Sequence, residues 1–192
     1  MSPLRKKTDK IRKILRAAYP DVKTALTHRN AFELLVATIL SAQTTDRQVN
    51  SVTEALFQRF PTAAALAAAP LREVEALIRP TGFFHNKARN IIACAKALAE
   101  RHNSQVQHRL ETLTQLPGVG RKTANVVLGA AFGIPGVVVD THVKRITGRL
   151  GLTEHTDPVK IEYDLMAIVP KRAWNALGPV SYTHLRAHET RR

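Results

Sequence analysis

Cysteine is almost absent from the sequence, which has a single one, at position 94. One cysteine excludes a disulfide framework and any metal site built from cysteines alone. Acidic residues are scarce as well, because 15 aspartates and glutamates face 29 lysines and arginines, giving a formal net charge of +14. A surplus of this size favours a polyanionic partner, most often nucleic acid, over an anionic membrane surface or simple solubility.

Long hydrophobic runs are also missing. No run approaches the roughly 18 residues that a membrane-spanning helix needs, and the basic start lacks the unbroken apolar core of a signal peptide. We therefore expect a cytoplasmic protein. Apolar residues nevertheless make up 44% of the 192 residues, which excludes a disordered chain and allows one large domain or two small ones.

The apolar residues recur at helical spacing almost throughout, which predicts an all-α fold. Ile11, Ile14, Leu15 and Ala18 mark one face of a first helix. The next stretch, to residue 40, follows a capping-box-like start at Asn30 and is apolar nearly all round, which predicts a central buried helix. Further helices are expected after a cap at Asp46 and over 63–69, 71–78, 87–101, 121–132, 141–150 and 159–169.

The segment Leu-Pro-Gly-Val-Gly at 116–120 is the most informative one. Two glycines separated by one residue permit a tight hairpin whose backbone N–H groups face outward at a helix N-terminus. Such a terminus binds phosphate, although a plain turn has the same pattern. A Walker A loop is excluded because Arg121 stands where that motif has glycine, and no strand precedes the segment as a dinucleotide-binding motif requires.

Lys122 lies in the first turn of the helix that follows. A cation there opposes the helix dipole, and Arg121 beside it adds like-charge repulsion. Both effects favour the neutral amine, as burial would, and a neutral amine is a nucleophile that can form a Schiff base. The alternative is an ordinary phosphate-contacting lysine, and local electrostatics do not separate the two.

Asp140 follows an apolar segment at 137–139 that we interpret as a buried connector rather than a strand. An aspartate before a helical pattern is commonly an N-cap. Capping leaves one carboxylate oxygen free, so the same side chain could accept a proton from an amine or stabilise positive charge on a sugar.

These motifs resemble a known family. Residues 116–124 are similar to the helix-hairpin-helix of the endonuclease III family of DNA glycosylases, and 139–142 resemble its catalytic-aspartate motif. The segments 40–46 and 81–88 resemble the family's two DNA-inserting loops. The resemblance covers about residues 1–178. It implies a bifunctional N-glycosylase and abasic-site lyase that acts as a monomer on oxidised pyrimidines in duplex DNA, in the bacterial cytoplasm at the nucleoid, with no membrane partner.

The resemblance also implies a domain plan and roles for single residues. A six-helix domain would span 24–135, and 1–23 with 136–178 would form a second helical domain. Lys122 matches the nucleophile that attacks the sugar C1′, forms a Schiff base and leads to β-elimination. Asp140 matches the aspartate that assists base loss and deprotonates the lysine.

The remaining implied contacts are with DNA. Gln43 matches the residue that fills the gap left by the extruded nucleotide, and Phe83 stands at the position of a hydrophobic wedge where the family often has leucine. Without the resemblance, Gln43 reads as a polar helix end and Phe83 as a core residue. Lys87 and Arg89 are expected on a solvated or phosphate-facing surface. The hairpin contacts would come from Pro117, Gly118, Val119, Gly120 and Arg121.

Two other functions are compatible with parts of this pattern. The adenine-specific branch of the superfamily usually lacks a lysine at the hairpin and carries a catalytic glutamate in the helix before its glutamine loop, but residues 35–40 contain no acid. A non-catalytic helix-hairpin-helix module would need neither Lys122 nor Asp140.

The pattern departs from the family in one place. Members usually close with four cysteines, spaced C-x6-C-x2-C-x5-C, that bind a [4Fe-4S] cluster, and none follows Cys94, which reads as a small core residue. Residues 179–192 instead match the translation of a sequencing-library adapter, so we expect native sequence to end near Gly178. A second domain without the cluster loop should be less stable, and the chemistry itself needs no cofactor.

Overall fold

The computed structural model describes residues 2–18 and 24–176 and contains no strand within them, which confirms the all-α class. None of the described helices is both long and apolar enough to cross a membrane. The elements in chain order are α1 (Pro3–Ala18), α2 (Ala31–Leu40), α3 (Asp46–Arg59), α4 (Ala63–Ala67), α5 (Leu71–Ile78), η1 (Arg79–Thr81), α6 (Phe84–Arg101), α7 (Leu110–Leu113), α8 (Arg121–Phe132), α9 (Thr141–Arg149), α10 (Pro158–Ile168) and η2 (Lys171–Ala176).

The chain divides into two compact units. One spans Ala25–Phe132 and holds α2 to α8, and the other combines Met1–Thr24 with the chain from Gly133 onward and holds α1, α9 and α10. The segment 179–192, expected to be a non-native tail, lies outside the described residues.

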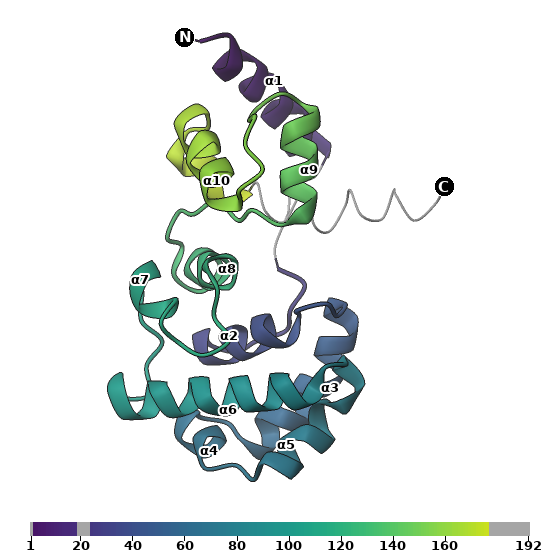
Figure 1. Cartoon of the computed structure of the whole chain (residues 1–192), viewed down its shortest axis with the longest axis vertical. Coiled ribbons are helices and arrows are strands. Elements are labelled where there is room, and N and C mark those ends of the chain that lie inside the picture. Colours follow the sequence, from purple (N-terminus) through teal and green to yellow (C-terminus); the bar gives the residue numbers. More distant parts are fainter. Residues whose placement is uncertain (1, 19–23, 177–192) are drawn as a thin grey trace. The chain divides into compact units, whose positions relative to one another are not determined.

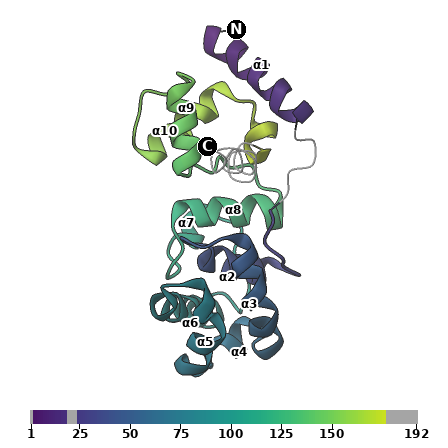
Figure 2. The ribbon, with the colours of Figure 1, turned by 90° about the vertical axis from the view of Figure 1, so that its right-hand side faces the viewer.

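Helix α2 is the centre of the 25–132 unit. Every residue from Phe32 to Leu40 is buried, and the helix contacts α3, α6 and α8. In both views it lies between α8 and α6 (Figure 1 and Figure 2). The Asn30 side chain accepts a hydrogen bond from the Glu33 N–H at 2.9 Å, which confirms the expected cap and the central buried helix.

Helix α3 has the expected buried side, with Val49, Val52 and Leu56 inside. The expectation that Asp46 caps it is wrong, because the cap is Thr45, whose hydroxyl accepts from the Gln48 N–H at 3.3 Å. Thr45 has the extended backbone that a cap requires, whereas Asp46 is already the first helical residue.

Helix α6 begins at Phe84, three residues before the expected start at Lys87, and runs against α4 and α5 (Figure 1). No side chain caps its start, so the sequence offers no capping signal there. Cys94 is buried on this helix, and burial raises the pKa of its thiol to about 12. The thiol is therefore neutral and serves as a small core residue, as expected.

The second unit has a smaller core. The buried connector at 137–139 is irregular rather than a strand, as expected, and Val137 and Val139 are part of this core. The core cluster consists of Val137, Val139, Val143, Leu152, Ile161 and Leu165.

Helix α1 contributes little to that core. Only Ile11 of its apolar residues packs against the cluster, and the expected apolar face is partly wrong because Ile14 is 60% exposed. The one buried residue of the helix is Thr8, whose hydroxyl donates to the Leu4 carbonyl at 2.8 Å. The Arg5 guanidinium donates twice to the Ala167 carbonyl, at 2.9 and 3.3 Å, and so ties α1 to α10.

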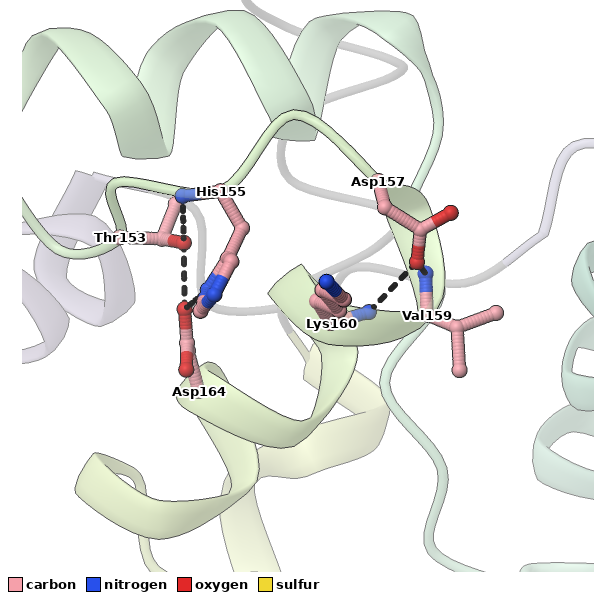
Figure 3. A network of polar contacts seen from close by, with 6 residues as sticks. All are labelled: Thr153, His155, Asp157, Val159, Lys160 and Asp164. Carbon is pink, nitrogen blue, oxygen red and sulfur yellow. Dashed lines mark hydrogen bonds and ion pairs between the residues drawn. The ribbon is translucent and has the colours of Figure 1, made fainter.

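A polar network organises the loop that leads into α10 (Figure 3). Asp164 Oδ2 accepts from the Thr153 hydroxyl at 2.5 Å and pairs with His155 Nδ1 at 2.8 Å. The hydrogen bonds from His155 and, secondly, Thr153 lower the pKa of Asp164. Asp157 caps the helix by accepting from the Val159 and Lys160 N–H groups, both at 3.0 Å.

Candidate functional site

The hairpin at 116–120 ends where α8 begins. Leu116 and Val119 are buried, and the Val119 N–H donates to the Leu116 carbonyl at 3.1 Å. Gly118 has a φ of +75°, and a Cβ there would lie 2.9 Å from Asn90 Cβ. Gly118 is therefore required both by its left-handed backbone and by the approach of Asn90, whereas a Cβ at Gly120 would meet nothing within 4 Å.

The hairpin presents backbone donors. Within the described part of the chain, the N–H groups of Gly118 and Gly120 make no hydrogen bond, while the Gly120 carbonyl accepts from the Ala124 N–H at 2.9 Å. These donors precede the positive end of the α8 dipole. Together they form an arrangement that can bind a phosphate group.

Lys122 is the second residue of α8, and its side chain is exposed. Arg121 beside it is half-buried. An exposed amine in the first turn after a donor-rich hairpin can reach an anionic ligand held at that hairpin.

Asp140 belongs to the other unit, where it caps α9. Its Oδ1 accepts a hydrogen bond from the Val143 N–H at 2.7 Å. The carboxylate makes no other hydrogen bond to a described residue, so Oδ2 is available. The side chain is half-buried. His142 Nδ1 lies 3.1 Å from a guanidinium nitrogen of Arg145, one turn further along α9.

Gln43 and Phe83 share an uncommon backbone conformation. Their φ angles are +55° and +49°, in the left-handed region that costs a non-glycine residue roughly 1–3 kcal/mol. Both side chains are exposed, and Phe83 is 68% exposed. The interpretation of Phe83 as a core residue is therefore wrong.

A cleft of about 240 Å³ brings these segments together within the 25–132 unit. Gln43 and Phe83 stand on the loops at its edge, and Gly118 adds the hairpin. The full lining is Ile39, Ala42, Gln43, Phe83, Asn86, Lys87, Asn90 and Gly118.

Lys87 does not lie on the solvated surface expected for it, because only 5% of the residue is exposed. Its ammonium donates to the Thr44 hydroxyl at 2.6 Å and to the Thr81 carbonyl at 2.9 Å. Burial lowers the pKa of Lys87. Sequence reasoning missed Thr44 and Thr81, because neither residue carries a local signal for a contact with a lysine 43 or 6 positions away.

Helix α2 carries one acid, Glu33, at its start. Its Oε2 accepts from the Arg29 N–H at 2.7 Å, and its Oε1 accepts from Arg29 Nε at 2.8 Å. The hydrogen bond to Glu33 and, secondly, the charge of its carboxylate raise the pKa of Arg29. Both carboxylate oxygens of Glu33 are thus engaged in holding the start of the helix.

The residues present do not fit a [4Fe-4S] cluster. Such a cluster takes four thiolate ligands, and the sequence has one cysteine, whose thiol is neutral inside α6. In the described ranges 2–18 and 24–176, no three His, Cys, Asp or Glu side chains come together as a metal site.

Residues 36–171 match a family described as HhH-GPD superfamily base excision DNA repair protein. The endonuclease III of Synechocystis sp. is 52% identical over 188 residues, which cover 97% of this chain and 86% of that protein. The endonuclease III of Bacillus subtilis is 45% identical over 82% of this chain and 72% of its own length.

The chain is also similar to proteins of solved structure. A structure described as a trapped endonuclease III–DNA covalent intermediate is 42% identical, with a TM-score of 0.88 over 92% of this chain and 84% of that one. A thermostable thymine-DNA glycosylase shares the fold at a TM-score of 0.77 and 19% identity, over 94% of this chain and 87% of that one.

Proposed function

The chain belongs to the endonuclease III family within the HhH-GPD superfamily of base excision DNA repair proteins, and from this premise we propose that it removes oxidised pyrimidines from duplex DNA and cuts the strand at the resulting abasic site. Family membership makes it a DNA glycosylase and abasic-site lyase. The observation that carries the assignment to this chain's residues is Lys122, an exposed amine in the first turn of α8 directly after the hairpin.

Lys122 is the nucleophile of the proposed reaction. The lone pair of its Nζ attacks the sugar C1′, and the bond between C1′ and the damaged base breaks with its electron pair leaving on the base. Loss of a proton from the amine and opening of the sugar ring give a Schiff base. Removal of a C2′ proton then expels the 3′ phosphate by β-elimination, and water hydrolyses the Schiff base to free the lysine.

A covalent step is consistent with the relatives. A structural relative has been described as a trapped endonuclease III–DNA covalent intermediate, and such an intermediate requires a nucleophilic side chain. In this chain Lys122 supplies a primary amine, which forms an imine that a hydride reagent can reduce.

Asp140 assists base loss and accepts the proton that Lys122 gives up. Its capping bond through Oδ1 fixes the carboxylate at the start of α9 and leaves Oδ2 for this task. The same side chain therefore serves folding and chemistry through different oxygens.

DNA binding in this proposal involves the hairpin, Gln43 and Phe83. The free N–H groups of Gly118 and Gly120 bind a backbone phosphate, with Pro117, Val119 and Arg121 at the same turn. Extruding a nucleotide unstacks the duplex, and inserted side chains offset that cost. Gln43 fills the gap and Phe83 wedges beside it, since both are exposed at one cleft.

A glutamate-dependent reaction on adenine is disfavoured by Glu33. It is the only acid of α2, and both of its oxygens are bound to Arg29.

We also propose that the protein has two domains, one at 24–135 and one formed by 1–23 together with 136–178. No step of the mechanism passes through an iron–sulfur cluster.

Borohydride trapping tests the proposed nucleophile. Wild-type protein should form a covalent adduct with a duplex carrying an oxidised pyrimidine or an abasic site, and Lys122→Arg should not, because a guanidinium keeps the charge but forms no stable imine under these conditions. Lys96→Arg, at an exposed lysine on α6, is the matched control and should trap like wild type. An adduct that survives Lys122→Arg at wild-type yield would refute the assignment.

A further inference from the structure

We propose that Lys87 is a positioning residue that fastens the Gln43 loop to the Phe83 loop, so that the two inserting side chains act as one unit. The inference rests on the proposed function of these loops. It begins from the buried ammonium of Lys87, a group that the mechanism above does not use.

Three hydrogen bonds join the loops into a closed triangle. The Lys87 ammonium donates to the Thr44 hydroxyl at 2.6 Å and to the Thr81 carbonyl at 2.9 Å. The Thr44 hydroxyl in turn donates to the same Thr81 carbonyl at 2.6 Å. The Thr81 hydroxyl donates to the Ile78 carbonyl at 2.8 Å, which ties the triangle to the end of α5.

The triangle lies between the two strained residues. Gln43 directly precedes Thr44, and only Gly82 separates Thr81 from Phe83. Left-handed φ angles at non-glycine residues persist only where surrounding contacts fix them. Here the contacts are to a buried side chain rather than to solvent-exposed groups, so the loops keep their conformation while Gln43 and Phe83 stay exposed for DNA.

A lysine suits this role because its ammonium has three donors and no acceptor. From the first turn of α6, which directly follows the Phe83 loop, it can bind one acceptor from each loop at once. Loss of the ammonium would leave the hydrogen bond from the Thr44 hydroxyl to the Thr81 carbonyl to join the loops. Holding the inserted groups even about 1 Å out of place can slow a reaction by about 100-fold.

Amide hydrogen exchange tests the positional part in the free protein. The Thr44 N–H bonds the Ser41 carbonyl at 3.2 Å and the Gly82 N–H bonds the Arg79 carbonyl at 3.3 Å. In Lys87→Met both amides should exchange about tenfold faster or more, while the Phe60 amide in α3's terminal turn keeps its rate. Lys96→Met is the matched control on the same helix, and unchanged protection at Thr44 and Gly82 in Lys87→Met overturns the proposal.

Single-turnover kinetics test the consequence for DNA. Lys87→Met should slow excision of an oxidised pyrimidine from a fully paired duplex by about 10- to 100-fold. Trapping at an abasic site in single-stranded DNA should fall by no more than about threefold, because no pair must be opened there. Equal losses on both substrates would indicate a merely structural lysine.

Two further variants keep the test decisive. Thr44→Val removes the bridging hydroxyl from a half-buried position and should reproduce the selective loss even if Lys87→Met unfolds. Combining Lys87→Met with Gln43→Ala should give less than the product of the single losses, because both act through one loop; a fully multiplicative loss counts against the proposal. If wild type excises nothing, the proposed function fails, whereas the exchange result still decides the link between the loops.

Discussion

The two units of this protein place their functional groups by different means. In the 25–132 unit, a helix buried from Phe32 to Leu40 supports a hairpin and two strained loops around a cleft. In the other unit the core is a small cluster, and Asp140 is held by its own capping bond at the start of α9. Packing fixes the first set of groups, whereas one local hydrogen bond fixes the second.

This difference has a consequence for mutation. A change in the packed unit should alter stability and DNA binding together, because the same elements serve both. A change at Asp140 can separate chemistry from folding, since one oxygen caps the helix and the other is available.

The largest effect is expected at Asp140. Asp140→Asn should slow base excision by about 10²- to 10⁴-fold, the range typical of a lost general acid or base. Asparagine is an equally good N-cap, so the melting temperature should remain that of wild type. Asp157→Asn, at the cap of α10, is the control and should excise normally. Full activity in Asp140→Asn would show that the carboxylate serves only as a cap.

Leu35→Ala probes the packed unit. Leu35 is fully buried in α2, and truncating such a leucine lowers the free energy of unfolding by about 2–5 kcal/mol. Ile14→Ala on α1, where the residue is 60% exposed, should change it by less than about 0.5 kcal/mol. Urea denaturation measures both. Similar losses of unfolding free energy in the two variants would contradict the contrast between the packed helix α2 and the weakly packed helix α1.

The hairpin glycines should respond unequally. Gly118→Ala combines a φ of +75° with a 2.9 Å approach to Asn90, and we expect a loss of about 1–3 kcal/mol in stability. It should also reduce the slope of log affinity for duplex DNA against log salt, because a phosphate contact is disturbed. Gly120→Ala should change stability by less than about 0.5 kcal/mol. Equal sensitivity at both glycines would be inconsistent with this geometry.

The smallest effect is a pH dependence of stability in the second unit. Hydrogen bonds from His155 and Thr153 lower the pKa of Asp164 below its ordinary value of 3.8 (Figure 3). The resulting stabilisation is present above the unfolded pKa and is lost as the pH falls through the folded pKa. Because the carboxylate is 31% exposed, it should amount to less than about 1 kcal/mol.

Denaturation between pH 6 and pH 2 checks this sign. In Asp164→Asn the free energy of unfolding should fall less steeply as the pH is lowered. Glu154→Gln, at an exposed neighbour, should leave this pH dependence unchanged. A steeper decrease of the free energy of unfolding with falling pH in Asp164→Asn would mean that folding raises the pKa of Asp164 instead of lowering it.

The sequence predicted helices wherever periodicity and capping agree. The bounds of α2 and α8 and the buried connector at 137–139 all follow from local patterns. The resemblance pointed to the loops at 40–46 and 81–88, and these loops share one cleft.

What the sequence could not predict depends on distant contacts. Lys87 has the local pattern of a surface residue, and its burial results from partners 43 and 6 residues away. The exposure of Phe83 and Ile14 likewise depends on which neighbours cover them, not on their own hydrophobicity. Asp46 was expected as a cap because both Thr45 and Asp46 are good capping residues, and only the backbone conformation distinguishes them.

The central claim is that Lys122 forms the covalent bond to DNA. Peptide mapping of the borohydride-reduced adduct by mass spectrometry tests it most directly, because the reduced sugar marks the reacting nitrogen. We predict that the mass increment lies on Lys122. A modification at any other lysine or at the chain's amino terminus, with Lys122 unmodified, would contradict the account.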